Sequence, residues 1–250
     1  MPLTPNVLPR LLPKNVVAVE LCDDVTEILY PEEEHFIARA VNKRVREFTT
    51  VRACARLALE RLDLRRPVQV PGPRGEPTWP TGIVGAMTHC QGYRAATVAR
   101  ASDFHSLGID AEPNSPLPPR IRSSVLSPAE MHHASALAEV QPGVAWERLM
   151  FSAKESVFKA WYPLAKTWLG FDDGEITFKL DHTFCARLHR SHLPPELQGR
   201  SLQGTWDCSH NLLVTALTVE TSNYTTSHRQ TAVDPNDRTG DISAIGPGEE

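Results

Sequence analysis

Two long helical patterns, each followed by short apolar segments that come in pairs, constrain the fold of this chain more than any other feature. The first pattern covers about residues 31–62 and the second about residues 145–161. In both, apolar residues recur at steps of three and four, which predicts a helix packed along one face. The first face is expected to contain Phe48, Val51, Ala55, Ala58, Leu59 and Leu62. The second is expected to contain Trp146, Leu149, Met150, Ala153, Val157, Ala160 and Trp161, with Pro163 just past the helix end.

The apolar segments after each helix predict small antiparallel sheets. Residues 83–88, 93–99 and 106–112 follow the first helix, and a polar break at 101–104 predicts a hairpin between the last two. Two further pairs follow the second helix: 176–180 with 184–188, and 204–208 with 212–218. The chain is therefore expected to be an α+β protein with two pseudo-symmetric halves, residues 1–113 and 114–220, each a helix packed on a small antiparallel sheet.

Local signals mark the boundaries of these elements. The proline-rich stretch from Pro113 to Pro119 is expected to end the first sheet. Ser127, Pro128 and Glu130 have the order of an N-cap, a first-turn proline and an N3 acid, which predicts the start of another helix. Residues 221–250 are rich in small and polar residues and poor in large apolar ones. Because such a segment buries too little surface to offset its ordering entropy, a disordered tail is predicted.

Charge and cysteine usage narrow the class of protein. A net charge of -4 argues against bulk electrostatic binding to nucleic acid or to an anionic membrane. The five cysteines are scattered and never form a C-x-x-C pair, which favours reduced thiols over disulfides or a zinc site. Prolines interrupt the N-terminus, so no signal peptide is expected, and no apolar stretch has the length of a membrane span. A soluble cytoplasmic protein is predicted.

Two acids lie two residues apart in a predicted strand. Asp110 and Glu112 should point to the same face, about 6–7 Å apart, because side chains alternate along a strand. Leu107, Ile109 and Ala111 should face the core, and Gly108 should leave room on the acidic face. Two solvated acids at a strand end remain an equally ordinary interpretation.

A second acid–base pair lies on the predicted second helix. Glu155 and Lys159 stand one turn apart, and the small Ser152 and Ser156 beside them would leave that face open to a ligand. An exposed ion pair is the simpler interpretation for such a spacing. Together with the two strand acids, however, this pair could hold a hard divalent cation against a phosphate.

Other polar residues carry weaker signals. Thr88 and His89 close a strand, where a lone histidine is more often structural. Arg44, Arg52 and Arg56 lie off the apolar stripe, either as a solvated face or as a cradle for phosphates. The loop at 71–77 is dense in proline and glycine. There is no P-loop and no G-x-G-x-x-G motif, which excludes a Walker-type nucleotide fold.

Four sequence blocks, taken in order, resemble a known family. They are residues 44–52, residues 75–80 leading to Thr88 and His89, residues 108–112 with the sequence GIDAE, and residues 151–161 with FSAKE followed by Lys159. Over about residues 30–218 the chain resembles the 4′-phosphopantetheinyl transferase superfamily of the surfactin and enterobactin type, in its actinobacterial branch. The resemblance implies two α+β halves with coenzyme A between them. It also implies transfer of phosphopantetheine from coenzyme A to a serine of an acyl, peptidyl or polyketide synthase carrier domain, with release of 3′,5′-ADP.

The resemblance also assigns roles to residues. It implies that Asp110, Glu112 and Glu155 hold Mg²⁺ or Mn²⁺, whose preference is for oxygen ligands. Because Ala111 cannot ligate, water or Glu155 would complete the site. Glu155 would act as general base toward the carrier serine, and Lys159 would stabilise the departing 3′,5′-ADP.

The coenzyme-binding residues follow from the same resemblance. Arg44 and Arg52 would bind the nucleotide end, His89 the 3′-phosphate with Thr88 beside it, and Arg74 and Gly75 would line the adenine and phosphate loop. Lys154 joins Glu155 and Lys159 among the residues expected to contact coenzyme A. Trp168 is expected either to wall the pantetheine channel or to be an ordinary core tryptophan. A monomer without nucleic-acid or membrane partners is expected.

Two other functions remain open at this point. The same acids would serve a Mg²⁺-dependent phosphoanhydride hydrolase that cleaves coenzyme A with water as nucleophile. The chain would also suit a carrier-binding module that has lost its chemistry. Which carriers are served, whether in fatty-acid, polyketide, nonribosomal-peptide or siderophore assembly, does not follow from the sequence.

Overall fold

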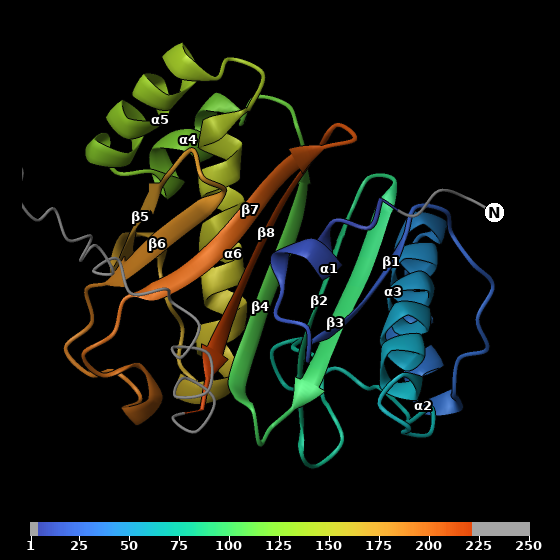
Figure 1. Cartoon of the computed structure of the whole chain (residues 1–250). Coiled ribbons are helices and arrows are strands. Elements are labelled where there is room, and N and C mark those ends of the chain that lie inside the picture. Colours follow the sequence, from blue (N-terminus) through green and yellow to red (C-terminus); the bar gives the residue numbers. More distant parts are fainter. Residues whose placement is uncertain (1–4, 222–250) are drawn as a thin grey trace, which may run out of the picture.

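A computed structural model describes residues 5–221 of the chain as two antiparallel sheets, each covered by a long helix (Figure 1). The smaller sheet has the order β1 (Val17–Leu21), β3 (Tyr93–Arg100), β2 (Ile83–Cys90). The larger has the order β4 (Phe104–Pro113), β8 (Leu212–Glu220), β7 (Leu202–Ser209), β6 (Thr183–Leu188), β5 (Gly174–Phe178). The predicted α+β fold is confirmed.

Helix α3 (Asn42–Glu60) covers the smaller sheet. Its predicted stripe is buried except for Leu62, which lies past the helix end and is partly buried. Cys54, Ala55, Ala58 and Leu59 form a core cluster with side chains of β1 and β3. The single helix expected over 31–62 is divided. A short helix α2 (Pro31–Glu34) and a 3-10 turn η1 (His35–Ile37) precede α3, because the backbone is extended at Val41, the residue before its first turn. A further short helix, α1 (Leu8–Leu11), lies near the N-terminus.

Helix α6 (Trp146–Ala165) covers the larger sheet, and its predicted apolar face lies in the largest core cluster. Pro163 lies inside this helix, so the prediction that it follows the helix end is wrong. The helix instead ends where Lys166 adopts a left-handed conformation, with φ of 52°. Helices α4 (Pro119–Val125) and α5 (Pro128–Val140) and the 3-10 turns η2 (Phe171–Asp173) and η3 (Pro195–Leu197) complete this half. The predicted capping box of Ser127 and Glu130 starts α5.

The predicted hairpin between residues 93–99 and 106–112 is wrong. Strand β3 pairs with β1 and β2, whereas β4 pairs along its length with β8. An N-terminal strand that the sequence analysis did not identify, β1, occupies the second edge of β3. The chain therefore crosses from one sheet to the other between Arg100 and Phe104. The other two predicted hairpins, β5 with β6 and β7 with β8, are confirmed.

The crossing places β4 beside β2, although these two strands belong to different sheets. The strand that carries Asp110 and Glu112 thus lies at the junction of the two halves. Among residues 5–221, no helix is long and apolar enough to cross a membrane. The predicted tail from 221 lies outside the described residues, apart from Thr221 itself.

Candidate active site

A cleft of about 660 Å³ opens between the two halves, within the range of small-molecule sites. It is bounded by α3, the loop that includes residues 71–79, β2, β4 and α6. Most of the residues that the sequence singled out line it, namely Arg44, Arg52, Arg74, Gly75, Thr88, His89, Asp110, Glu155, Lys159 and Trp168. Glu112 and Lys154 are not among its lining residues.

Asp110 is the most highly connected acid of the cleft. Its Oδ1 accepts hydrogen bonds from Lys159 Nζ at 2.7 Å and from Thr88 Oγ1 at 3.1 Å. These donors come from α6 and β2, so one carboxylate oxygen joins three elements. Its Oδ2 is buried and has no hydrogen-bond partner. A buried oxygen without a partner is costly, and a cation bound there would satisfy it.

Glu112 is held by an arginine that the sequence analysis did not assign. Arg148 Nη1 donates to Glu112 Oε2 at 2.7 Å, and its other nitrogens donate to the carbonyl oxygens of Ser115 and Pro116. Burial raises the pKa of Glu112, whereas the hydrogen bond from Arg148 lowers it. Arg148 therefore fixes the direction of this carboxylate and partly compensates its charge.

Glu155 lines the cleft from α6. Burial raises its pKa, and the negative charges of Asp110 and Glu112 raise it further, while Lys159 opposes them. Among the described residues the Glu155 carboxylate has no hydrogen-bond partner. A raised pKa makes a carboxylate a stronger proton acceptor than one with its ordinary pKa.

The three acids fit a divalent cation in chemistry but do not form a closed ligand set. Among residues 5–221, no three His, Cys, Asp or Glu side chains converge closely enough to hold a metal ion. Lys159 and Arg148 instead supply the positive charge beside Asp110 and Glu112. The unpartnered Asp110 Oδ2 and the mutual repulsion of the three carboxylates nevertheless favour a hard cation at this place.

Two predictions about the surroundings of these acids are wrong. Ser152 and Ser156 do not flank an open face, because both are fully buried and hydrogen-bond to Thr215 of β8. Gly108 leaves no room for a ligand, because the backbone carbonyl of Ser156 occupies the space that a Cβ would take. What approaches the acidic strand at Gly108 is therefore helix α6 itself.

Lys154 points away from the cleft. Its Nζ lies 2.8 Å from Glu130 Oε2 and donates to the carbonyl oxygens of Phe171 and Gly174. The side chain is buried. Adjacent residues of a helix point about 100° apart, so Glu155 faces the cleft while Lys154 ties α6 to α5 and η2. Lys154 does not line the cleft, but it lines a small neighbouring pocket of about 70 Å³ together with Glu155 and Trp168.

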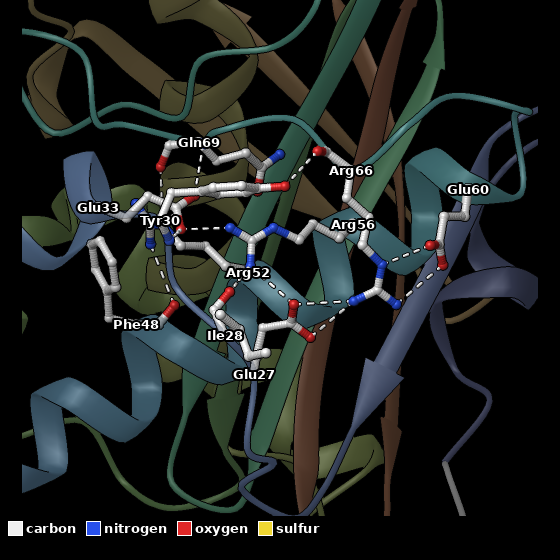
Figure 2. Close-up of polar contacts among 10 residues, drawn as sticks. All are labelled: Glu27, Ile28, Tyr30, Glu33, Phe48, Arg52, Arg56, Glu60, Arg66 and Gln69. Atoms are coloured by element: carbon white, nitrogen blue, oxygen red, sulfur yellow. Dashed lines mark hydrogen bonds and ion pairs between the residues drawn. The ribbon is translucent and has the colours of Figure 1, made fainter.

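The three arginines of α3 that the sequence analysis singled out differ in their surroundings. Arg44 is exposed, and its Nη1 lies 3.1 Å from His89 Nε2 at the mouth of the cleft. Arg52 and Arg56 are buried, so the solvated-face interpretation is wrong for both. Burial lowers the pKa of Arg52 to about 10, and Glu33 opposes that shift, so the guanidinium stays charged at neutral pH. Figure 2 shows both arginines within a network of acids and carbonyl groups.

The remaining predicted residues surround the opening. Arg74 and Gly75 lie in a loop closed by a bridge between Pro71 and Pro77, and Gly75 has φ of 85°, which favours glycine. Trp168 is 61% exposed, with its ring centroid 4.9 Å from that of Phe158, so it is not a core tryptophan.

Sequence reasoning missed several lining residues, among them Trp79, Met87, Tyr162 and Lys166. Lys166 lies over the Tyr162 ring, 5.4 Å from its centroid. For Tyr162 and Lys166, the only sequence signal was their position near Pro163, where a helix end was expected.

The fold and site together define a class: an α+β protein with a cleft between its two halves that is lined by carboxylates and by cationic side chains. Comparison with known proteins identifies the family. Residues 32–99 match the 4′-phosphopantetheinyl transferase N-terminal domain, and residues 106–216 match the 4′-phosphopantetheinyl transferase superfamily. The chain belongs to the 4′-phosphopantetheinyl transferase superfamily.

Individual relatives agree with this assignment. The chain is 52% identical to the 4′-phosphopantetheinyl transferase Svp of Streptomyces mobaraensis, over 79% of this chain and 81% of that protein. It is 41% identical to PptT of Mycobacterium tuberculosis, over 86% and 97% of the two chains. It is 44% identical to Npt of Nocardia iowensis, over 70% and 78%. All three are named 4′-phosphopantetheinyl transferases, so the predicted family and enzyme class are confirmed. Members of the family use coenzyme A and a divalent metal.

Proposed function

We propose that this chain transfers phosphopantetheine from coenzyme A to a serine hydroxyl of an apo acyl, peptidyl or polyketide synthase carrier domain. The observation that carries the proposal is the convergence of Asp110, Glu155 and Lys159 on one cleft wall, opposite Arg44, Arg74 and His89. The acids and the ammonium group suit a pyrophosphate that is being cleaved, and the cations suit the charged nucleotide end.

Each residue has a defined part in the transfer. The serine oxygen forms a bond to the β-phosphorus of the coenzyme A pyrophosphate as the bond to 3′,5′-ADP breaks. Glu155 takes the serine proton, directly or through water. Lys159 donates to the pyrophosphate oxygens and stabilises the leaving group.

A divalent cation completes the site in this proposal. Asp110, Glu112 and Glu155 would hold it, and Mg²⁺ is the ion we favour, with Mn²⁺ as an alternative for the same oxygen donors. When bound, the cation neutralises charge on the pyrophosphate oxygens. Arg148 holds the Glu112 carboxylate in one position through its hydrogen bond. A metal-bound carboxylate is a weak base, so the position of Glu155 matters more than its basicity.

The nucleotide contacts are the second part of the proposal. Arg44 and Arg52 bind the nucleotide end, His89 binds the 3′-phosphate beside Thr88, and Trp168 lines the pantetheine path. A cytoplasmic monomer with no nucleic-acid or membrane partner is also proposed. The free state of all cysteines between residues 5 and 221 supports a reducing compartment.

Intact-mass spectrometry of an apo carrier protein tests the function. After incubation with this protein, coenzyme A and Mg²⁺, the carrier should gain the mass of one phosphopantetheine group, and EDTA should abolish the gain. Coenzyme A cleavage without any carrier gain would instead identify the hydrolase. Carrier binding with neither reaction would identify the non-catalytic module.

A further inference from the structure

A buried acid outside the cleft joins the two buried arginines of α3 to the chain segment that enters the cleft loop. The group consists of Tyr30, Glu33, Arg52, Arg56 and Gln69, and is called here the Glu33 cluster (Figure 2). The side chains of Glu33 and Arg56 are 0% and 1% exposed. None of these residues except Arg52 lines the cleft.

Both oxygens of Glu33 are used. Its Oε2 accepts from Arg56 Nη2 at 2.5 Å and from the Tyr30 backbone N–H at 3.0 Å. Its Oε1 accepts from the Gln69 backbone N–H at 2.7 Å and lies 3.9 Å from Arg52 Nε. One carboxylate on α2 therefore contacts α3 and the entry of the loop at the same time.

Gln69 connects this carboxylate to the cleft. Its carbonyl oxygen accepts from Arg52 Nε at 2.9 Å, so the Gln69 peptide groups bond to Glu33 on one side and Arg52 on the other. Three residues earlier, the Arg66 carbonyl oxygen accepts from the Tyr30 hydroxyl. Pro71, Arg74 and Gly75, which line the cleft, come directly after this anchored segment.

The Glu33 carboxylate is also the ion-pair partner of Arg52. The Arg52 guanidinium stacks on the Phe48 ring, with Cζ 3.1 Å from the ring centroid, and donates to the Phe48 carbonyl oxygen. Removing the Glu33 charge would leave buried Arg52 without a carboxylate partner, whereas Arg56 would keep Glu27 at 3.0 Å. A buried charge that loses its partner moves or becomes hydrated, since leaving it unpaired is costly.

We infer that Glu33 is a positioning residue for coenzyme A: it holds Arg52 and the loop that includes residues 71–79 in the geometry that receives the nucleotide end. The inference rests on the proposed function and adds a residue that does not itself touch the substrate. A displacement of about 1 Å at a binding group is enough to weaken the binding of its ligand strongly. Because Arg52 and the loop receive the nucleotide end, loss of Glu33 should weaken coenzyme A binding and leave the chemical step intact.

The test compares two isosteric changes, Glu33→Gln and Glu60→Gln. Both replace a carboxylate that pairs with an arginine, but Glu60 is 42% exposed and pairs with Arg66, which keeps Glu27 as a second partner. Glu33→Gln should raise KM and the calorimetric Kd for coenzyme A about tenfold, with kcat at saturating coenzyme A within about twofold of wild type. Glu60→Gln should change none of these constants.

Two outcomes would overturn the inference: folded Glu33→Gln with wild-type KM and Kd, or a loss confined to kcat. If Glu33→Gln does not fold, Tyr30→Phe removes only the hydroxyl that holds the Arg66 carbonyl, and it should raise Kd for coenzyme A with unchanged kcat. A Tyr30→Phe variant with wild-type Kd would then overturn the inference. Absence of transfer by the wild-type protein would contradict the proposed function instead, because the Kd comparison does not depend on transfer.

Discussion

Lys159 Nζ lies 2.7 Å from Asp110 Oδ1 and 3.0 Å from the Ile109 carbonyl oxygen, so one ammonium group ties helix α6 to strand β4. The same Asp110 oxygen accepts from Thr88 of β2, a strand of the other sheet. The carboxylate and ammonium groups proposed for chemistry therefore also hold the two halves of the protein together. Loss of a group that only joins these elements is therefore expected to lower stability, whereas loss of a group that takes part in the reaction is expected to lower activity.

Replacing Glu155 by Gln should reduce the rate of transfer far more than it weakens coenzyme A binding. An amide cannot accept the serine proton, and loss of a general base costs about 10²–10⁴-fold in rate. The rate is measured from the mass gain of an apo carrier, and binding from calorimetry with coenzyme A. Glu139→Gln, at an exposed position of α5, is the matched control and should be unchanged. Undiminished transfer by Glu155→Gln would refute the catalytic assignment.

Thr88→Val should destabilise the protein, whereas Thr97→Val should not. Thr88 Oγ1 donates to Asp110 and accepts from the Ala111 backbone N–H, so valine leaves two buried groups without this partner. Such a loss costs about 1–3 kcal/mol. The Thr97 hydroxyl is equally buried in the adjacent strand but has no partner. Urea unfolding measures both free energies, and equal effects would contradict the role assigned to the Thr88 hydroxyl.

Gly108→Ala should loosen the packing of α6 on β4. A Cβ at this position would overlap the backbone carbonyl of Ser156, and backbone cannot move as easily as a side-chain tip. Overpacking of this kind costs about 1–3 kcal/mol in unfolding free energy. Gly143→Ala is the control, because nothing lies within 4 Å of its Cβ position. Wild-type stability of Gly108→Ala would show that helix and strand can separate without cost.

His89 should make stability depend on pH below 6.5. Partial burial lowers its pKa below the usual 6.5, and the neighbouring Arg44 and Lys159 act in the same direction, against Glu47. Just below pH 6.5 the unfolded chain therefore binds a proton that the folded chain does not, so stability decreases as pH falls and is level above 6.5. The unfolding free energy of wild type relative to His89→Gln should shrink as pH falls below that value.

Thermal or urea unfolding from about pH 5 to pH 8 measures this difference. The exposed His132→Gln is the control and should track wild type throughout. A constant difference between wild type and His89→Gln across the range would contradict the assignment.

Local periodicity and capping were sufficient to place most elements. The apolar steps of α3 and α6, the capping box of Ser127 and Glu130, and the hairpins β5 with β6 and β7 with β8 are all short-range patterns. Period-two alternation also placed Leu107, Ile109 and Ala111 in the core and Asp110 on the opposite face. The resemblance of four sequence blocks to a known family supplied the predicted coenzyme-binding residues, and most of those residues line the cleft.

Tertiary structure decided which strands pair and which charges are buried. The partner of β4 is β8, about a hundred residues later, and β1 takes the second edge of β3, so no local pattern predicted either pairing. Burial of Arg52 and Arg56 depends on Glu33 of another segment, and the inward direction of Ser156 depends on Thr215. The sequence by itself determined which residues share a face of each helix and strand, because that depends on backbone periodicity. Only the folded chain decided what each face meets, because long-range pairing sets the surroundings of a side chain.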